Sequence, residues 1–175
     1  IKCPINLQLC NDCTLVQQEY TAPQDFLYSR HYWYRSGTTE TMRNALRNVV
    51  VAASNMVNLS AGDVVLDIGS NDGTLLRNYA LDLVKIGVEP ADNLATEENY
   101  AGLFLVHDFW SWDAYPIRDK AKIITACGMF YDLEDPNQFI ADIPKELHPD
   151  GEIIAQHMCL KQTVEMKDVG NFAHE

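Results

Sequence analysis

The sequence has little positive charge and no long hydrophobic run. Its 175 residues include 13 lysines and arginines against 25 aspartates and glutamates, which gives a formal net charge of −12. Nucleic-acid backbones and anionic membrane surfaces attract basic surfaces, so this balance argues against either as a general partner. No stretch approaches the roughly 18 to 20 apolar residues that a membrane-spanning helix needs. We therefore expect a protein that binds neither nucleic acid nor membrane.

Both termini lack the usual signals. The sequence starts at Ile1, with neither an initiator methionine nor the charged-then-apolar leader of a secretory signal peptide. It ends at Glu175 without a helix stop or a turn signal. Both ends look cut, and we expect a fragment of a cytoplasmic protein. With 47% hydrophobic and 22% charged residues, the chain can bury a core without covalent staples.

The five cysteines are odd in number and too unevenly spread for a disulfide framework. Cys10 and Cys13 have the Cys-x-x-Cys spacing, which places two thiolates on one turn and suits half of a tetrahedral zinc site. The other ligands would come from Cys3 or from residues upstream. A redox dithiol and chance spacing remain alternatives, although a redox motif should open a helix and residues 14–17 have the pattern of a strand.

Three regions of the chain differ in their patterns. Residues 1–30 form a small irregular module around the cysteine pair. Residues 31–60 contain an aromatic segment and a connecting helix from Glu40 to Leu59, where apolar residues recur at spacings of three and four and Thr38 or Thr39 is the expected N-cap. Residues 61–175 form the largest region, in which short apolar runs alternate with helical segments.

The last region has five short apolar runs, each of which predicts a strand: 63–68, 84–89, 103–106, 122–126 and 151–156. Helices are predicted between them at 74–81 and 136–147. Strands that alternate with helices at this pitch indicate βαβ units and a parallel sheet covered on both faces. The expected fold class is therefore α/β, a doubly wound parallel sheet preceded by a small module.

The turn after the first of these strands lacks both common phosphate-binding patterns. Residues 69–73 contain neither the G-x-G-x-x-G fingerprint nor the lysine of the phosphate-binding loop. Asp67 and Asp72 flank the turn and would repel a pyrophosphate. They suit a positively charged ligand, and S-adenosylmethionine carries both an ammonium and a sulfonium group. Ligands of such sheets bind at the carboxyl ends of the strands, which is where this turn lies.

An acid at the end of the second strand supports the same cofactor. Glu89 is placed to accept hydrogen bonds from both hydroxyls of a ribose. The alternative is an ordinary strand-to-helix turn followed by a solvated glutamate. The turn, the acid and the strand order together favour the cofactor.

Residues 68–76, Ile-Gly-Ser-Asn-Asp-Gly-Thr-Leu-Leu, resemble the signature of the nucleotide-sugar C-methyltransferases of deoxysugar biosynthesis. These are class I S-adenosylmethionine-dependent enzymes with a Rossmann-like fold and a small N-terminal zinc-binding domain. Residues 10–17 resemble the second zinc knuckle of that domain, and residues 32–43 resemble the tyrosine-rich segment before the first core helix. The resemblance implies a structural zinc at Cys10 and Cys13 and a C-terminally truncated methyltransferase domain.

The resemblance also implies which residues hold the cofactor. With Asp67 from the argument above, the predicted cofactor-binding residues are Asp67, Gly69, Asn71, Asp72, Gly73 and Glu89, with Asp108 and Phe109 around the adenine and Cys127 beside the methionine portion and the substrate.

Methylation at carbon needs a base to remove a proton next to a carbonyl and a donor to the enolate oxygen. The predicted catalytic residues are Tyr32, Tyr34, His174 and Glu175. The last two resemble the start of the family's His-Glu-His segment, with Ala173 where many members have a tyrosine. For the tyrosines, an aromatic packing patch remains the alternative. For His174, the alternative is an exposed residue in the tail with no catalytic role.

The sequence therefore predicts S-adenosylmethionine-dependent methyl transfer to a small molecule, specifically C-methylation of a nucleotide-linked keto-deoxysugar. Two alternatives remain open. One is methylation at oxygen or nitrogen of another small molecule, which needs no carbon-acid base. The other is a non-catalytic module that binds the cofactor or zinc.

Overall fold

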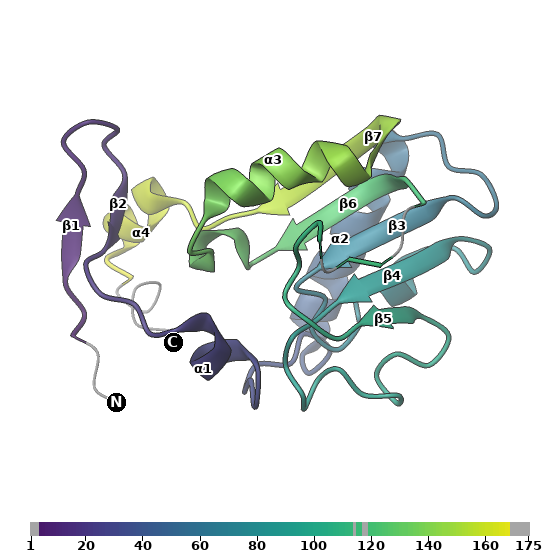
Figure 1. The fold of residues 1–175 in the computed structure, drawn as a ribbon, viewed down its shortest axis with the longest axis horizontal. Coiled ribbons are helices and arrows are strands. Elements are labelled where there is room, and N and C mark those ends of the chain that lie inside the picture. Colours follow the sequence, from purple (N-terminus) through teal and green to yellow (C-terminus); the bar gives the residue numbers. More distant parts are fainter. Residues whose placement is uncertain (1–3, 114, 117–118, 169–175) are drawn as a thin grey trace.

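The computed structural model describes residues 4–113, 115–116 and 119–168. Figure 1 shows a twisted sheet with helices on both faces and an N-terminal hairpin set apart from it. The elements in chain order are β1 (Leu7–Leu9), β2 (Val16–Gln18), α1 (Gln24–Tyr28), α2 (Glu40–Met56), β3 (Val64–Ile68), the 3-10 turn η1 (Leu76–Asn78), β4 (Val84–Val88), β5 (Phe104–Val106), β6 (Ala121–Cys127), the 3-10 turn η2 (Phe130–Asp132), α3 (Pro136–Glu146), β7 (Leu147–Gln156) and α4 (Leu160–Met166).

The main sheet has five strands in the order β5-β4-β3-β6-β7, and all neighbouring strands are parallel. From the central strand β3 the chain moves outward through β4 to β5, then returns to β6 on the other side of β3. Leu66 pairs with Ile86 on one side and with Ile124 on the other. The predicted doubly wound parallel sheet is confirmed, and its strand order reverses between β3 and β6. Ligands of such sheets bind near that point.

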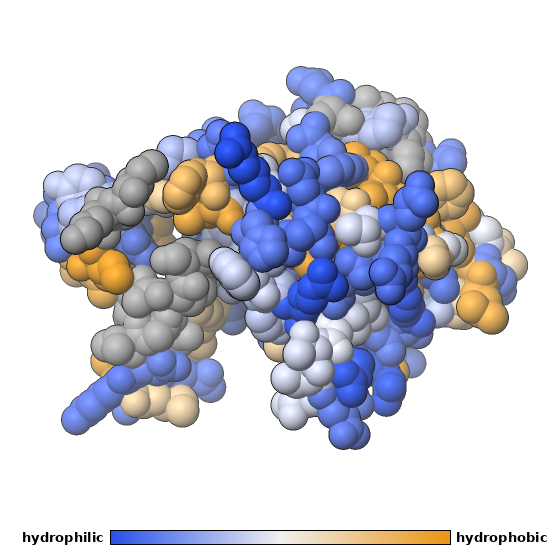
Figure 2. Space-filling model, turned by 90° about the horizontal axis from the view of Figure 1, so that it is seen from below, coloured by the Kyte–Doolittle hydropathy of each residue, from blue (hydrophilic) through white to orange (hydrophobic). Residues whose placement is uncertain are grey.

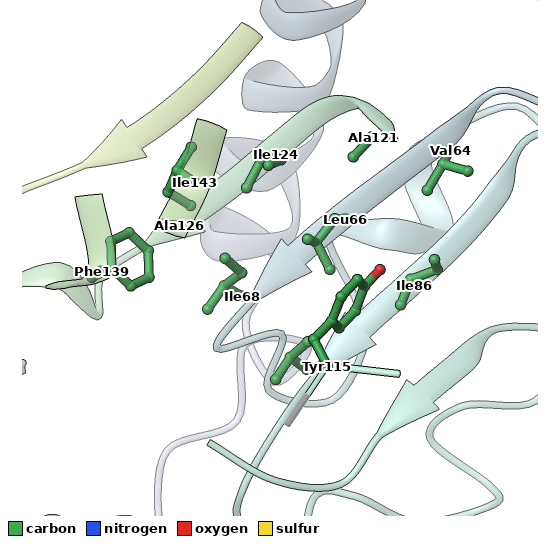
Figure 3. Close-up of a cluster of buried hydrophobic side chains, with 11 residues drawn as sticks. Val64, Leu66, Ile68, Ile86, Tyr115, Ala121, Ile124, Ala126, Phe139 and Ile143 are labelled. Carbon is green, nitrogen blue, oxygen red and sulfur yellow. The ribbon is translucent and has the colours of Figure 1, made fainter. Parts of the chain in front are cut away.

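Side chains of β3 alternate between two apolar layers. Leu66 and Ile68 pack with Phe139 and Ile143 of α3 on one face, as Figure 3 shows. Val65 packs on the opposite face in a cluster that includes three buried side chains of α2. All five residues of β3 are buried, because a central parallel strand is covered on both faces.

Both long helices begin where the sequence places them. The Thr39 side chain accepts a hydrogen bond from the N–H of Met42 (3.2 Å), which makes it the N-cap of α2. Asp135 caps α3 in the same way, accepting from the N–H of Gln138 (2.9 Å). Each helix ends earlier than predicted: α2 ends at Met56 rather than Leu59, and α3 ends at Glu146, where β7 begins at the next residue.

The predicted helix over residues 74–81 is wrong. Only the short 3-10 turn η1 forms there. The Asn78 side chain donates hydrogen bonds to the carbonyl oxygens of Thr74 (2.9 Å) and Leu75 (3.4 Å), which offers the backbone an alternative to helical pairing. The next residue, Tyr79, is extended and buried, and it leads the chain back towards β4.

The N-terminal hairpin contributes nothing to this core. β1 and β2 pair antiparallel, with Leu9 opposite Val16, and neither strand has a buried residue. The loop between them is closed by two backbone hydrogen bonds, Cys10 N–H to Leu15 O (2.9 Å) and Thr14 N–H to Cys10 O (3.0 Å). An isolated two-stranded hairpin is marginally stable in water, so this one depends on additional contacts.

The face seen in Figure 2 is mostly hydrophilic, and its apolar residues lie in separate patches rather than in one continuous area. Within the described residues, none of the helices has the length and apolar character that crossing a membrane requires.

Candidate functional site

A cavity of about 520 Å³ lies at the carboxyl ends of β3, β4, β6 and β7, where the strand order reverses. Its size is typical of a small-molecule site. The strand ends and the turns after them contribute Ile68, Gly69, Asn71, Val88, Glu89, Pro90, Cys127, Gly128, Met129, Gln156, His157 and Met158. The rest of the wall comes from Gln24, Tyr28, Tyr32, Tyr34, Ser36, Met42, Leu46, Phe109, Trp110, Tyr131, Asp132 and Leu133.

The turn after β3 presents its backbone to this cavity. Gly69 has a φ of 72°, and a Cβ there would lie 3.1 Å from the Met129 side chain across the cavity wall. Asn71 also has a positive φ, 53°, a conformation that asparagine tolerates better than most residues. The N–H groups of Gly69 and Ser70 both donate to Val88 O, at 2.9 and 3.1 Å, so the turn is fixed to the end of β4.

Glu89 joins the turn to the second strand. Its Oε2 accepts the N–H of Asn71 and its Oε1 accepts the N–H of Ala91, both at 2.8 Å. Burial raises the pKa of Glu89 to about 7, although these two hydrogen bonds act in the opposite direction. A carboxylate has about four acceptor positions, so these contacts use two of them and leave acceptor capacity beside the cavity.

Asp67 lies behind the cavity wall rather than on it. Its carboxylate accepts a hydrogen bond from the Thr125 hydroxyl (2.5 Å) within the layer between the sheet and α2. Burial, the dominant cause, raises the pKa of Asp67 to about 7, and the Glu89 carboxylate adds to the shift. The Asp67 side chain therefore does not line the cavity, and it is bonded to β6 behind the cavity wall.

Asp72 and Gly73 are also outside the cavity lining. Asp72 Oδ2 accepts the N–H of Gly37 (2.9 Å), and its Oδ1 accepts the N–H of Thr74 (3.2 Å). At Gly73, which has a positive φ, an added Cβ would come within 2.9 Å of the Arg77 and Leu103 side chains. Asp72 and Gly73 therefore fix the conformation of the turn from the side that faces away from the cavity.

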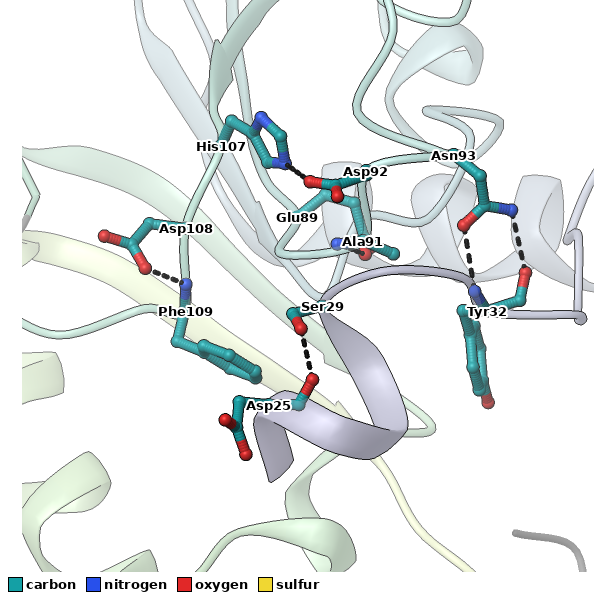
Figure 4. A network of polar contacts seen from close by, with 10 residues as sticks. All are labelled: Asp25, Ser29, Tyr32, Glu89, Ala91, Asp92, Asn93, His107, Asp108 and Phe109. Atoms are coloured by element: carbon teal, nitrogen blue, oxygen red, sulfur yellow. Dashed lines mark hydrogen bonds and ion pairs between the residues drawn. The ribbon is translucent and has the colours of Figure 1, made fainter. Parts of the chain in front are cut away.

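The loop after β5 gives the cavity an aromatic wall. Phe109 lines the cavity, whereas the neighbouring Asp108 is exposed and accepts the N–H of Phe109 on its own Oδ1 (2.7 Å), as Figure 4 shows. Trp110, which the sequence argument did not single out, lines the cavity beside Phe109 and packs edge-on against Phe139 with ring centres 5.0 Å apart.

Of the predicted catalytic residues, Tyr32 and Tyr34 line the cavity. Burial raises the pKa of Tyr34 above its ordinary value, so its phenol keeps its proton at neutral pH. The other two, His174 and Glu175, lie outside the described residues.

Several residues that line the cavity were not predicted from the sequence, because no local pattern marks them. Tyr28 packs edge-on against Tyr32 at 5.4 Å, and His157 packs edge-on against Phe130 at 4.9 Å. Tyr131 lies in η2, the short turn after β6. The fold brings these residues to the cavity from separate elements: Tyr28 from α1, Tyr131 from η2 and His157 from the end of β7. Proximity to a predicted strand end was the one signal that could have indicated Tyr131 and His157.

The cysteine pair lies on the hairpin loop and is not part of the cavity. Hydrogen bonds from the backbone N–H groups of Cys13 and Asp12 lower the pKa of the Cys10 thiol and so favour the thiolate. Among the described residues no third His, Cys, Asp or Glu joins the pair, and Cys3 lies outside them. The strand β2 follows the pair, which does not fit the helix that a thioredoxin-type redox motif should open.

Comparisons with known proteins agree on the fold. The chain is similar in fold to the solved YcgJ protein from Bacillus subtilis, with a TM-score of 0.55 and 16% identity over 72% of this chain and 58% of that one. Coclaurine N-methyltransferase bound to N-methylheliamine and SAH also gives a TM-score of 0.55 at 16% identity, over 75% of this chain and 40% of that one. The chain has a Rossmann-like methyltransferase fold.

Two further known proteins are similar to this chain. The cyclopropane synthase MmaA2 from Mycobacterium tuberculosis has a TM-score of 0.51 and 20% identity, over 78% of this chain and 53% of that one. A curated C-methyltransferase, NovU from Streptomyces niveus, is 23% identical over 177 aligned residues, which cover 98% of this chain and 42% of NovU. The chain thus spans less than half the length of that relative. No family model matches the sequence.

Proposed function

We propose that the cavity binds S-adenosylmethionine and that the protein transfers its methyl group to a small molecule. The observation that carries this proposal is the Glu89 carboxylate, which is buried at the end of β4 and bonded to the turn after β3. This arrangement lies where open α/β sheets bind nucleotide-like ligands and where a carboxylate accepts ribose hydroxyls. The fold that the chain shares with coclaurine N-methyltransferase, which was solved with SAH, and the similarity to NovU support the same cofactor.

The charge of the cavity also fits this cofactor. Its described lining includes the acids Glu89 and Asp132 but neither a lysine nor an arginine. Asp72 adds a carboxylate close behind the turn, and Asp67, whose pKa is raised to about 7, adds partial negative charge at neutral pH. Glu89 would hold the ribose, Gly69 would give the methionine portion room to approach the backbone, and Phe109 would pack against the adenine. When bound, S-adenosylmethionine supplies an electrophilic methyl group.

For the acceptor, we propose C-methylation of a nucleotide-linked keto-sugar, with Tyr32, Tyr34, His174 and Glu175 as catalytic residues. The similarity to NovU supports carbon as the methylated atom. Tyr34 keeps its proton, because burial raises the pKa of its phenol. Its phenol is therefore suited to donate a hydrogen bond to a developing enolate oxygen rather than to remove the proton from carbon. That base would come from the segment that contains His174 and Glu175.

Solvent exchange separates carbon methylation from methylation at oxygen or nitrogen. A nucleotide keto-sugar is incubated in heavy water with the enzyme and S-adenosylhomocysteine, which cannot donate a methyl group. Deuterium should enter the carbon next to the carbonyl faster than in buffer alone, and the Tyr34→Phe variant should slow this exchange about 100-fold. Transfer of a labelled methyl group to oxygen or nitrogen acceptors, without such exchange, would overturn the carbon assignment.

We also propose that Cys10 and Cys13 supply two ligands of a structural zinc. The lowered pKa of the Cys10 thiol and the hairpin without buried residues support this site. The remaining ligands would come from outside the described residues, where Cys3 is one candidate. Metal analysis of the purified protein should find one zinc per chain, and a Cys10→Ser variant that keeps its metal would refute the assignment.

A further inference from the structure

Residues 29–37, called the strap here, connect α1 to α2 and carry two of the predicted catalytic side chains. Tyr32, Tyr34 and Ser36 of the strap line the cavity. Residues 31–35 have no regular secondary structure, so no helical or strand ladder fixes the backbone that holds these side chains. Their position depends on contacts from elsewhere in the fold.

One contact comes from Asn93, in the loop that follows β4. The Asn93 side chain accepts the N–H of Tyr32 on Oδ1 (2.8 Å) and donates from Nδ2 to the carbonyl oxygen of Tyr32 (3.0 Å), as Figure 4 shows. It therefore pairs with the backbone of Tyr32 in both directions, as a neighbouring strand would. The backbone around Asn93 adds two more bonds, Asp92 N–H to Ser29 O (2.7 Å) and Arg35 Nη2 to Asn93 O (3.1 Å).

A second contact comes from Asn71 in the turn after β3. Its Oδ1 accepts the N–H of Ser36 (2.9 Å), and its Nδ2 donates to Tyr34 O (3.0 Å). The backbone N–H of the same residue donates to Glu89. Asn71 therefore connects the strap directly to the carboxylate that is proposed to hold the cofactor, and a change at Asn71 would disturb both.

Asn93 differs from Asn71 in one useful respect. It makes the same two-way contact with the strap, but it does not line the cavity and shows no bond to Glu89 in the described part of the chain. A change at Asn93 therefore removes the support of Tyr32 without removing a proposed cofactor contact.

We propose that Asn93 is a positioning residue, which acts through the backbone of Tyr32 and holds the strap so that Tyr32 and Tyr34 face the acceptor. The inference rests on the proposed function, because it assumes that the cavity holds a methyl donor and its acceptor. It assigns the two asparagines different roles. Asn71 couples the strap to cofactor binding, whereas Asn93 controls acceptor turnover alone.

The test uses two variants of Asn93 in the full chain. Asn93→Ala removes both hydrogen bonds to Tyr32, and Asn93→Asp keeps the acceptor for its N–H but loses the donor. Asn78→Ala is the matched control, because the Asn78 side chain also binds backbone carbonyls but lies outside the strap and the cavity lining. Three quantities are measured: amide hydrogen exchange of peptides from residues 29–37, the Kd for S-adenosylmethionine, and kcat and KM for a nucleotide keto-sugar as the methyl acceptor.

We expect Asn93→Ala to raise strap exchange about tenfold and to lower kcat/KM for the acceptor by about tenfold or more, with Asn93→Asp between it and the unchanged protein. The cofactor Kd should change less than threefold, and Asn78→Ala should leave all three quantities unchanged. Unchanged strap exchange in Asn93→Ala would overturn the proposal. So would a loss of cofactor affinity equal to the loss in kcat/KM. If the unchanged protein binds no S-adenosylmethionine, the proposed function fails, while the exchange result still decides whether Asn93 holds the strap.

Discussion

The turn after β3 and the loop of the N-terminal hairpin are both short, and both carry residues that are proposed to hold a bound group, yet they are supported very differently. The turn is tied to β4 by hydrogen bonds from Gly69, Ser70 and Asn71, and it rests on a buried sheet. The hairpin loop is held by two backbone hydrogen bonds within the loop, and the two strands beside it have no buried residue. The proposed cofactor site therefore rests on a buried sheet, whereas the proposed zinc site lies on a hairpin that has no buried residue to hold it in place.

Metal removal is the strongest way to test this contrast. Structural zinc contributes roughly 10–16 kcal/mol in small zinc-binding peptides, far more than the hairpin can gain from burial. We expect a chelator to abolish the amide protection of residues 7–18, measured by hydrogen exchange, and to leave the exchange of β3 unchanged. Equal loss of protection in both regions would contradict the contrast, and so would a hairpin that stays protected without metal.

A substitution at Gly87 tests how closely the turn after β3 packs against β4. A Cβ at this position of β4 would lie 2.6 Å from Ser70 Oγ and 2.6 Å from Tyr100 Cε1, and both atoms belong to buried side chains. The Gly87→Ala substitution should therefore lower the free energy of unfolding by about 1–3 kcal/mol, as overpacking does. Urea denaturation measures this loss. The control Glu152→Ala, at an exposed strand position, should change the free energy of unfolding by less than about 0.5 kcal/mol.

The pH dependence of stability should report on the two acids at the turn. The pKa values of Asp67 and Glu89 rise from 3.8 and 4.5 to about 7 in the folded protein. Between these limits the folded state binds more protons than the unfolded state, so stability falls as pH rises. Linkage for two such acids gives a loss of about 5 kcal/mol between pH 5 and pH 8, so we expect the ligand-free Tm to fall by roughly 10–20 °C over this range. An Asp67→Asn/Glu89→Gln double variant with an unchanged slope would contradict this assignment.

The sequence predicted the parts of the fold that local patterns determine. The apolar runs at 63–68 and 84–89 became β3 and β4, and Thr39 became the cap of α2. The helix expected at 74–81 failed because the Asn78 side chain competes for backbone carbonyls, which periodicity does not reveal.

The site was harder to predict, because the direction of a side chain depends on the layer it enters. An acid near the end of a strand was evident at Asp67, but strand alternation turns that side chain into the layer shared with α2 and away from the cavity. Glu89 comes one residue after its strand and lies at the cavity. The support of Tyr32 by Asn93 joins residues far apart in sequence, and no motif in this sequence indicates it.

Calorimetric titration of S-adenosylmethionine into the protein tests directly whether the cavity binds this cofactor. We expect saturable binding at one site, and we expect Glu89→Ala to weaken the affinity by about 10- to 100-fold, because the hydrogen bonds lost involve a charged group. The Glu152→Ala control should bind like the unchanged protein. Absence of binding, or equal affinity in the Glu89→Ala variant, would contradict the assignment of the cavity.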